Sequence, residues 1–563
     1  MTDRFALPEQ PRPSLYPLLT MACATVIIAL LAFPLGRMVW NLVIGGDGGI
    51  AQAAQVFTQP WFWPVLFNTL VIVGLSTLFA LIIGATLAWV NVRTDAGIGV
   101  AGTLVPIIPL LIPNVAMAIG WVFIAAPRVG FLNGVLSLLP EWMSFQVNIY
   151  TWSGLIFVYT INAVPYVYLI VSAALRNLDP ALEEAAQVNG AGLFRTLRTV
   201  SIPAIRPALI SSALLVTITS LGLYSIPGVI ATTARVDVMT TRIVFLLNRD
   251  FPPRLAEAQA LGVVMLLVVL ALWIFEMRAR RSGQFATLGG RASSSSRIEM
   301  GLWKWPARCL TIAYLAATSA LPVIALLVVS LQTYWSPSID VTTFNLANFN
   351  QALFLHRLTG TALTNSLYLS AVGALVAMGI AVIVAIYAVN RSSAFSAFVD
   401  GAVKSSAAIP NLILAVGFLV AFSGAPFFLS GTTTILLLAF IVMYIAPGSI
   451  AATAAINQVG KDLREASLTS GADDGRTVRK IIVPLAFPGF VAGTAIVFVH
   501  MMGDLSAAAL LAGPNNPVVG FAIMSIWEAG TFGVLAALSV CLCVVNMGTV
   551  ALMFGLGHLI RRR

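Results

Sequence analysis

Residues 179–209 read DPALEEAAQVNGAGLFRTLRTVSIPAIRPAL, and residues 461–490 read KDLREASLTSGADDGRTVRKIIVPLAFPGF. The two stretches align at a constant offset of 281 residues. The matched pairs are Glu184 with Glu465, Ala185 with Ala466, Gly190 with Gly471, Ala191 with Ala472, Pro203 with Pro484 and Pro207 with Pro488. A single copy could be an ordinary amphipathic loop, because Ala and Glu are common helix formers. Two copies in register favour a shared function.

The local chemistry of the first stretch predicts a short helix and a bend. Asp179 can cap free backbone N–H groups, and Pro180 is tolerated in a first helical turn. The alanines that follow continue the helix, and Gly190 is expected to end it with a positive φ. A basic helical turn comes next, and Pro203 and Pro207 are expected to mark the entry to the following apolar run. The product is a short helix on the membrane face.

The composition places these loops in a membrane protein. The chain has 563 residues, is 59% hydrophobic and has a mean hydropathy of +0.95. Only 9% of its residues are Asp, Glu, Lys or Arg, whereas soluble proteins have about 25%. A soluble enzyme and a disordered chain are therefore excluded. The net charge is +10, but the basic residues do not cluster with aromatic residues as a nucleic-acid-binding face would require. We therefore expect no nucleic-acid partner.

The apolar runs predict an all-α polytopic protein with about 12 transmembrane helices. The predicted spans are residues 16–40, 65–90, 100–125, 151–174, 207–232, 256–276, 306–332, 364–389, 401–422, 433–455, 488–512 and 533–558.

The spans divide into two copies of six. We expect a first repeat at residues 1–276, a cytoplasmic linker rich in Arg, Gly and Ser at 277–305, and a second repeat at 306–563. Asn68-Thr69 matches Asn365-Ser366, and Pro113-Asn114 matches Pro410-Asn411, both at an offset of 297 residues. Because six is an even number, both copies insert in the same orientation, as parallel repeats.

The positive charges predict that both termini are cytoplasmic. Cytoplasmic segments of membrane proteins carry an excess of Lys and Arg. With both ends inside, all but seven of the 31 Lys and Arg residues fall in cytoplasmic segments; the seven are Arg37, Arg128, Arg235, Arg242, Arg249, Arg254 and Arg357.

The two loops resemble the EAA motif of permease subunits of binding-protein-dependent ABC importers, which have the MetI-like fold of the methionine-importer permease. The motif runs E-A-A, three residues, G, and then a hydrophobic-Pro ending. The first loop matches it with Glu184, Ala185, Ala186, Gly190 and Pro203; the second matches with Glu465, Ala466, Gly471 and Pro484 and departs at Ser467. The chain is similar to two fused copies, as in ferric-iron, thiamine and phosphonate permeases.

This resemblance implies the partners and the mechanism. Each EAA loop would dock into one of two cytoplasmic ABC ATPase subunits, where ATP and Mg²⁺ are bound. A periplasmic or extracellular solute-binding protein would deliver the cargo, and the chain would lie in a bacterial inner membrane. The sequence itself contains no G-x-x-x-x-G-K-[ST] nucleotide loop, so we expect a transporter subunit without its own ATPase, cofactor or metal. Ferric iron is the expected cargo; thiamine, an aminophosphonate and a polyamine are the alternatives.

A few polar residues in the apolar runs are candidates for the translocation path, because a charge at mid-bilayer costs roughly 2.5–3.5 kcal/mol. His500 and Asp504 are four residues apart, which predicts a shared face of the eleventh span. They could line the path or form a gate; alternatively, Asp504 could be a helix-end residue satisfied by its loop. Asn114 and Asn411 follow prolines that predict kinks in the third spans.

Two other classes of protein remain as alternatives. A secondary carrier can also have two parallel six-span halves. However, the loop NVRTDAGIG after the second run does not fit the G-x-x-x-D-R-x-G-R-R-like pattern of major-facilitator carriers. A membrane-embedded enzyme would need more candidate catalytic residues than His500 and Asp504.

Overall fold

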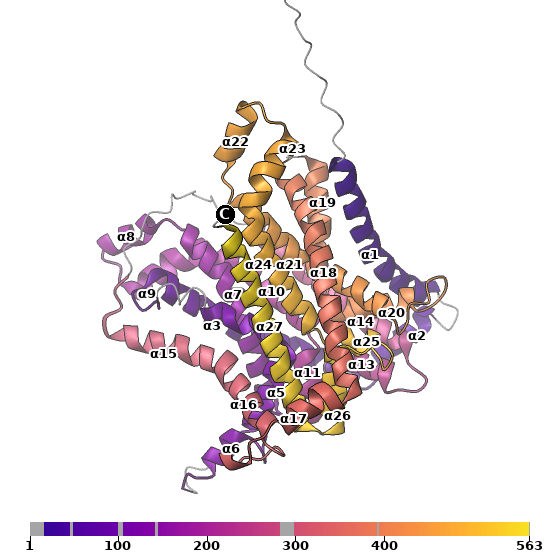
Figure 1. Cartoon of the computed structure of the whole chain (residues 1–563). Coiled ribbons are helices and arrows are strands. Elements are labelled where there is room, and N and C mark those ends of the chain that lie inside the picture. Colours follow the sequence, from indigo (N-terminus) through magenta and orange to yellow (C-terminus); the bar gives the residue numbers. More distant parts are fainter. Residues whose placement is uncertain are drawn as a thin grey trace, which may run out of the picture.

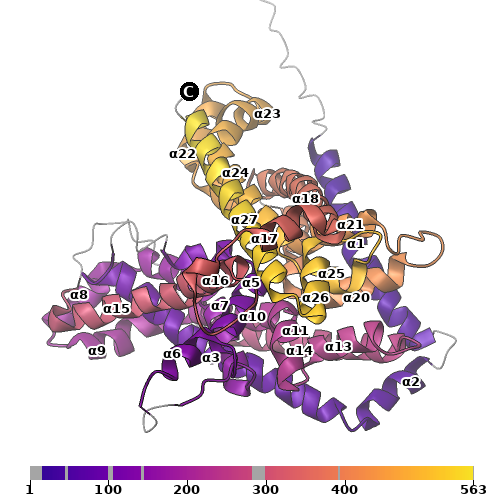
Figure 2. The ribbon, with the colours of Figure 1, turned by 60° about the horizontal axis from the view of Figure 1, so that its bottom comes forward.

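The computed structural model describes residues 16–44, 49–98, 105–140, 145–281, 298–390 and 393–561. Within them every regular element is helical, apart from one isolated bridge between Thr94 and Ile298. Figure 1 and Figure 2 show a bundle of long helices with shorter ones at its ends. The predicted all-α polytopic class is confirmed.

The first repeat consists of α1 (Tyr16–Ile44), α2 (Gly49–Gln55), α3 (Phe62–Arg93), α5 (Asn114–Ala125), α6 (Phe131–Leu136), α7 (Trp152–Asn177), α8 (Pro180–Val188), α9 (Leu193–Thr196), α10 (Ile202–Leu221), α11 (Ser225–Val229), α12 (Ala231–Ala234), α13 (Met239–Asn248) and α14 (Leu255–Arg281). The second repeat consists of α15 (Lys304–Leu315), α16 (Leu321–Leu331), α17 (Ala347–Asn350), α18 (Arg357–Asn390), α19 (Ala394–Lys404), α20 (Asn411–Phe422), α21 (Thr433–Asn457), α22 (Lys461–Thr469), α23 (Asp474–Thr477), α24 (Val483–Met502), α25 (Ala508–Leu511), α26 (Val519–Ala529) and α27 (Phe532–Arg561).

Ten continuous helices in the described residues are long and apolar enough to cross a membrane. The expectation of a continuous, kinked third span in each repeat was wrong. In the first repeat, α5 has 12 residues and reaches only about 18 Å at 1.5 Å per residue. In the second repeat, the helical stretch Ala394–Ala408 and α20 meet at an angle of 100°. The breaks fall at Pro113 and Pro410, because proline lacks an N–H and the residue before it avoids the helical conformation.

The broken helices still complete a crossing, because the helices on either side of them run in parallel. Phe67 near the start of α3 packs on Trp152 at the start of α7, with ring centroids 6.5 Å apart. At the other end, Arg93 Nη2 donates a hydrogen bond of 2.7 Å to the Leu178 carbonyl. Two neighbours that run in the same direction need a return crossing between them, and Val105–Leu111 with α5 is the apolar helical segment there.

The second repeat follows the same rule. Gly373 of α18 faces Leu437 of α21, and further along both helices Ala381 faces Gly448. The two helices are therefore parallel, and α19 with α20 must return the chain between them. The described residues thus contain ten candidate spans, or 11 with the bent pair of the second repeat, against the twelve predicted. The remaining crossing, at residues 105–125, rests on the parallel arrangement of α3 and α7 alone.

The first helix of each repeat packs on the other repeat. α1 lies against α18, α19 and α20, whereas α16 lies against α5, an exchange that is visible in Figures 1 and 2. Gly417 of α20 faces Pro34 of α1, and Gly120 of α5 faces Pro322 of α16. Trp121 Nε1 also donates a hydrogen bond of 2.9 Å to the Ala317 carbonyl. The sequence analysis did not foresee this exchange, which makes the repeats interdependent.

The Gly120→Ala substitution is expected to destabilise the protein. A Cβ at Gly120 would lie 2.6 Å from the Pro322 carbonyl oxygen and 2.7 Å from its Cα, so α5 and α16 would have to separate at a cost of about 1–3 kcal/mol. The melting temperature in detergent, followed by size-exclusion chromatography, measures this effect. Gly379→Ala in α18 is the control, since a Cβ there has no neighbour within 4 Å; a similar loss in both variants would contradict the packing argument.

The ends of the expected linker are ordered. α14 continues to Arg281, and the chain from Ile298 onward docks on the end of α3. Lys304 Nζ lies 2.9 Å from Asp95 Oδ2, and this hydrogen bond lowers the pKa of the Asp95 carboxyl. Residues 282–297 of the predicted linker lie outside the described residues, as do residues 1–15 and 562–563 at the termini, whose cytoplasmic location stays a prediction.

Candidate functional site

The matched loops form the same structure in both repeats. The predicted cap is present, because the Asp179 side chain accepts a hydrogen bond of 3.0 Å from the Ala181 N–H. α8 then spans nine residues and so does α22. In Figures 1 and 2, α8 with α9 and α22 with α23 lie well apart, each projecting from the bundle.

Both loop helices end in a Schellman motif at the predicted glycine. Gly190 and Gly471 each have a φ of +81°. The Gly190 and Ala191 N–H groups bond to the carbonyls of Gln187 and Ala186, at 2.9 and 3.0 Å. The second loop repeats this geometry with Gly471 to Leu468 at 3.0 Å and Ala472 to Ser467 at 3.1 Å. These bonds satisfy carbonyls that a helix end otherwise leaves without partners.

The EAA residues are mostly accessible. Glu184, Ala185, Glu465 and Ala466 are exposed, Ala186 is half-buried, and both Pro203 and Pro484 are exposed. Ser467, where the sequence departs from the motif, forms a hydrogen bond of 2.8 Å between its Oγ and Thr477 Oγ1 of α23. The departure therefore adds a contact within the loop and leaves the backbone geometry unchanged. Leu182 and Leu463 occupy equivalent positions and are 41% and 51% exposed, which leaves an apolar side chain open on each loop helix.

The prolines lie inside the next helix and not at its start. The helices begin earlier, at Phe194 and Asp474, and the entry to the membrane at the prolines stays a prediction. A π-helical turn at Leu197–Ser201 precedes Pro203, and an equivalent turn at Val478–Ile482 precedes Pro484. A π turn shifts the hydrogen-bond pattern by one residue, which accommodates a residue without an N–H. Consequently α9 continues into α10, and α23 continues into α24.

The far ends of α10 and α24 meet the broken helices of the opposite repeat. A Cβ on Gly222, which ends α10, would lie 2.7 Å from the Pro410 Cβ, and one on Gly503, which ends α24, would lie 2.9 Å from the Pro113 Cβ. Ser506 Oγ also donates a hydrogen bond of 3.4 Å to the Gly222 carbonyl. We call the Gly222–Pro410 and Gly503–Pro113 contacts together the cross-repeat seam. It brings Asn114 and Asn411, which follow these prolines, beside the ends of both helices.

A polar cluster lies on one side of the seam. Tyr444 of α21 donates a hydrogen bond of 2.5 Å to Asp504 Oδ2. Asn411 Nδ2 donates to the same tyrosine hydroxyl at 3.3 Å, and the His500 and Tyr444 rings lie 5.8 Å apart between centroids. Asp504 is 7% exposed and also accepts a bond of 2.7 Å from the Ala507 N–H. Three of the four predicted path residues therefore gather around Tyr444, which the sequence analysis missed.

Two details of the prediction need correction. α24 ends at Met502, so Asp504 lies beyond the helix and does not share a helical face with His500. Asn114 is not bonded to this cluster; its Oδ1 accepts a hydrogen bond of 2.7 Å from Asn162 Nδ2. Asn162 and Tyr444 occupy equivalent positions at an offset of 282 residues. In both repeats the residue after the proline bonds to this equivalent position, but Asn114 accepts whereas Asn411 donates. The second repeat also adds the Asp504 carboxylate.

The matched Asn68-Thr69 and Asn365-Ser366 pairs each hold the segment that leads into a later helix of the same repeat, residues 237–239 at the start of α13 and residues 517–519 at the start of α26. Asn68 Nδ2 donates to the Asp237 carbonyl at 2.9 Å, and Thr69 Oγ1 accepts from the Met239 N–H at 2.8 Å. Asn365 and Ser366 hold Pro517 and Val519 with the same two bonds at 2.9 and 2.8 Å.

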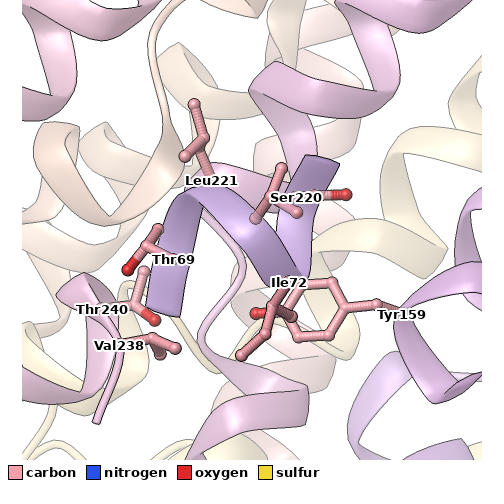
Figure 3. A pocket seen from close by; sticks show the side chains of 8 residues that line it. Thr69, Ile72, Tyr159, Ser220, Leu221, Val238 and Thr240 are labelled. Atoms are coloured by element: carbon pink, nitrogen blue, oxygen red, sulfur yellow. The ribbon is translucent and has the colours of Figure 1, made fainter. Parts of the chain in front are cut away.

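A small cavity lies beside Thr69 in the first repeat (Figure 3). Its volume is about 10 Å³, which is room for one water. Its other lining residues are Ile72, Val73, Tyr159, Ser220, Leu221, Val238 and Thr240.

The comparisons with known proteins identify the family. A sequence profile described as "Binding-protein-dependent transport system inner membrane component" matches residues 80–341 and 377–563, more than half of the chain. The chain belongs to this family. It is thus a permease of a binding-protein-dependent ABC importer, a multi-pass protein of the inner membrane, with the MetI-like domain present twice.

Two sequence relatives and one solved structure are similar to this chain. The "Ferric transport system permease protein FbpB" of Actinobacillus pleuropneumoniae is 23% identical over 89% of this chain and 72% of its own length. The "Putative 2-aminoethylphosphonate transport system permease protein PhnU" of Salmonella typhimurium is 30% identical over 39% of this chain and 79% of its own length. A bacterial alginate ABC transporter chain has a TM-score of 0.41 at 23% identity, covering 48% of this chain and 97% of its own.

Proposed function

We propose that this permease imports ferric iron, that an external solute-binding protein delivers the iron, and that two cytoplasmic ATPase subunits drive the transport by docking on α8 and α22. ATP and Mg²⁺ would be bound in the ATPase subunits and not in this chain. The observation that carries the proposal is the pair of exposed nine-residue helices with the same glycine-ended geometry in both repeats. Two equivalent sockets on two identical subunits would require such a matched pair.

The helix connections supply a route between the loops and the path. α9 continues into α10, so a displacement of α8 acts on a helix whose other end, Gly222, contacts Pro410. α23 continues into α24 in the same way, and Gly503 contacts Pro113. Each loop helix is thereby connected to the seam between the repeats through one continuous helical segment. Coupling requires a two-state element that both sites bias, and the seam is our candidate for that element.

The polar cluster is our candidate for the closed part of the path. The contacts of Pro113 and Pro410 hold the seam together, and opening must separate them. The Tyr444–Asp504 hydrogen bond lies beside the seam, within the second repeat. Asp504, His500 and Asn411 would then line the path, with Asn114 on the opposite side. This assignment of the four residues rests on their convergence at the place where the two repeats meet.

The cargo assignment rests on relatives. Permeases described as ferric transport proteins match 82–90% of this chain, whereas the aminophosphonate relative matches 39% of it. Proteoliposomes containing the permease, its ATPase and its binding protein test the assignment. We expect ATP-dependent uptake of radiolabelled ferric iron. Uptake of thiamine, 2-aminoethylphosphonate or a polyamine in place of iron would support the importer function and contradict ferric iron as the cargo.

A further inference from the structure

The glutamate next to the exposed motif residue is buried and bonded. Glu183 is 4% exposed, although it lies in the first turn of a loop helix whose other side faces solvent. Its Oε2 lies 3.5 Å from Arg93 Nε at the end of α3, and its Oε1 accepts a hydrogen bond of 2.6 Å from Ser201 Oγ. One carboxylate therefore joins α8 to α3 and to the π turn that leads into α10.

Arg93 holds the start of α8 from two sides. It is 5% exposed, and its Nη2 donates to the Leu178 carbonyl, which immediately precedes the capping residue Asp179. The chain after Arg93 is in turn held by the end of the linker and the start of α15, because the Ile298 N–H donates a hydrogen bond of 2.9 Å to the Arg93 carbonyl and Lys304 pairs with Asp95. The contacts thus extend from α8 through the end of α3 to the first helix of the second repeat.

The second loop does not have this set of residues. At the repeat offsets, Arg464 stands where the first loop has Glu183, Asn390 where it has Arg93, and Ile482 where it has Ser201. Arg464 Nη2 lies 3.6 Å from Asp474 Oδ1, an acidic residue of the same loop. The Ser467–Thr477 bond also closes within the loop. The second loop therefore lacks the carboxylate that joins the first loop to α3.

We propose that Glu183 is a positioning residue that makes the two ATPase-docking loops mechanically inequivalent. Through Arg93 and Ser201 it makes α8 move together with α3 and α10, whereas α22 has no carboxylate at the equivalent position. The inference rests on the proposed docking of an ATPase on both loop helices. A buried ion pair is weak evidence for stability, because the cost of removing two charges from water offsets their attraction. The proposed role differs from a packing contact in that the pair transmits the movement of α8 to α3.

The test compares removal of one charge with removal of both. Glu183→Gln leaves the Arg93 charge buried without its partner, so both thermal stability and transport should fall. Arg93→Met with Glu183→Met removes both charges, and such replacements often restore stability. We expect the double variant to assemble with the ATPase at parental levels and melt near the parental temperature. The stimulation of ATP hydrolysis by loaded binding protein should nevertheless drop about tenfold.

Matched variants decide between the outcomes. Lys404→Met with Asp400→Asn, which breaks an i,i+4 pair in α19, should change the stimulation less than about twofold because such helix pairs contribute little. A double variant at Arg93 and Glu183 with parental stimulation would overturn the inference, as would an equal loss from the α19 variant. If the double variant does not assemble, Ser201→Ala decides, since it keeps the ion pair and removes only the bond to the π turn; parental stimulation in Ser201→Ala would then overturn it. A parental permease that shows no stimulated hydrolysis would instead reject the proposed function.

Discussion

Simultaneous replacement of Gly190 and Gly471 by valine is expected to abolish ATP-driven transport. Both residues have a φ of +81°, a conformation that costs an L-amino acid about 1–2 kcal/mol and is least accessible to β-branched residues. A Cβ at either position has no neighbour within 4 Å, so the effect is purely conformational. Both Schellman motifs would open, and the exposed faces of α8 and α22 would lose their orientation. ATP-dependent uptake in proteoliposomes and co-purification of the ATPase measure the loss.

Gly192→Val is the control for this prediction. Gly192 lies in the same loop, also has open space at its Cβ and does not have a positive φ, so uptake should remain within about twofold of the parent. Gly190→Asn with Gly471→Asn should be intermediate, because Asn tolerates the left-handed conformation better than other side chains. If Gly192→Val impairs uptake as strongly as the double valine variant, the backbone argument fails.

Asp504→Asn is expected to lower transport at least about tenfold while leaving assembly intact. The amide can keep the short contact with the Ala507 N–H, but it replaces the charge-assisted bond from Tyr444, and hydrogen bonds to charged groups contribute about 1.5–3 kcal/mol. Tyr444→Phe removes the same bond from the other side and should have an effect of the same sign. Uptake normalised to the amount of assembled complex is the measurement.

An exposed ion pair nearby provides the control for Asp504→Asn. Arg249 Nη2 and Glu528 Oε1 lie 2.5 Å apart and connect the two repeats, but their side chains are 59% and 48% exposed. Because exposed pairs contribute less than about 1 kcal/mol, Glu528→Gln should leave uptake within twofold. Normal uptake by Asp504→Asn at normal expression would refute the assignment of Asp504 to the path.

The sequence predicted the features that depend on local chemistry or on repetition. The constant offset between the loops predicted two equivalent helices, and glycine at the end of each predicted the positive φ that is present at Gly190 and Gly471. The Asn68-Thr69 and Asn365-Ser366 match was recognised as a sign of duplication, but its structural role in fastening two loops depends on backbone groups far along the chain.

The features that the sequence did not predict depend on tertiary contacts. Apolar composition does not distinguish one long helix from a short helix after a break. The sequence therefore predicts a kinked but continuous helix at Pro113 and at Pro410, where the structure has breaks. The position of Asp504 depended on where α24 ends, and helix ends are the least certain part of any sequence-based assignment. Glu183 was passed over beside Glu184, because only its contact with Arg93, on a distant helix, shows that it is the buried member of the two.

Site-specific cross-linking at the loop helices tests the central claim most directly. Leu182 and Leu463 are exposed at equivalent positions, so a photoreactive residue at either position in native membranes should label the partner that docks there. We predict that mass spectrometry identifies the same ABC ATPase at both positions, and that the label disappears in the Gly190→Val, Gly471→Val variant. The absence of an ATPase at both positions, together with uptake driven by an ion gradient in ATP-free vesicles, would contradict the account and favour a secondary carrier.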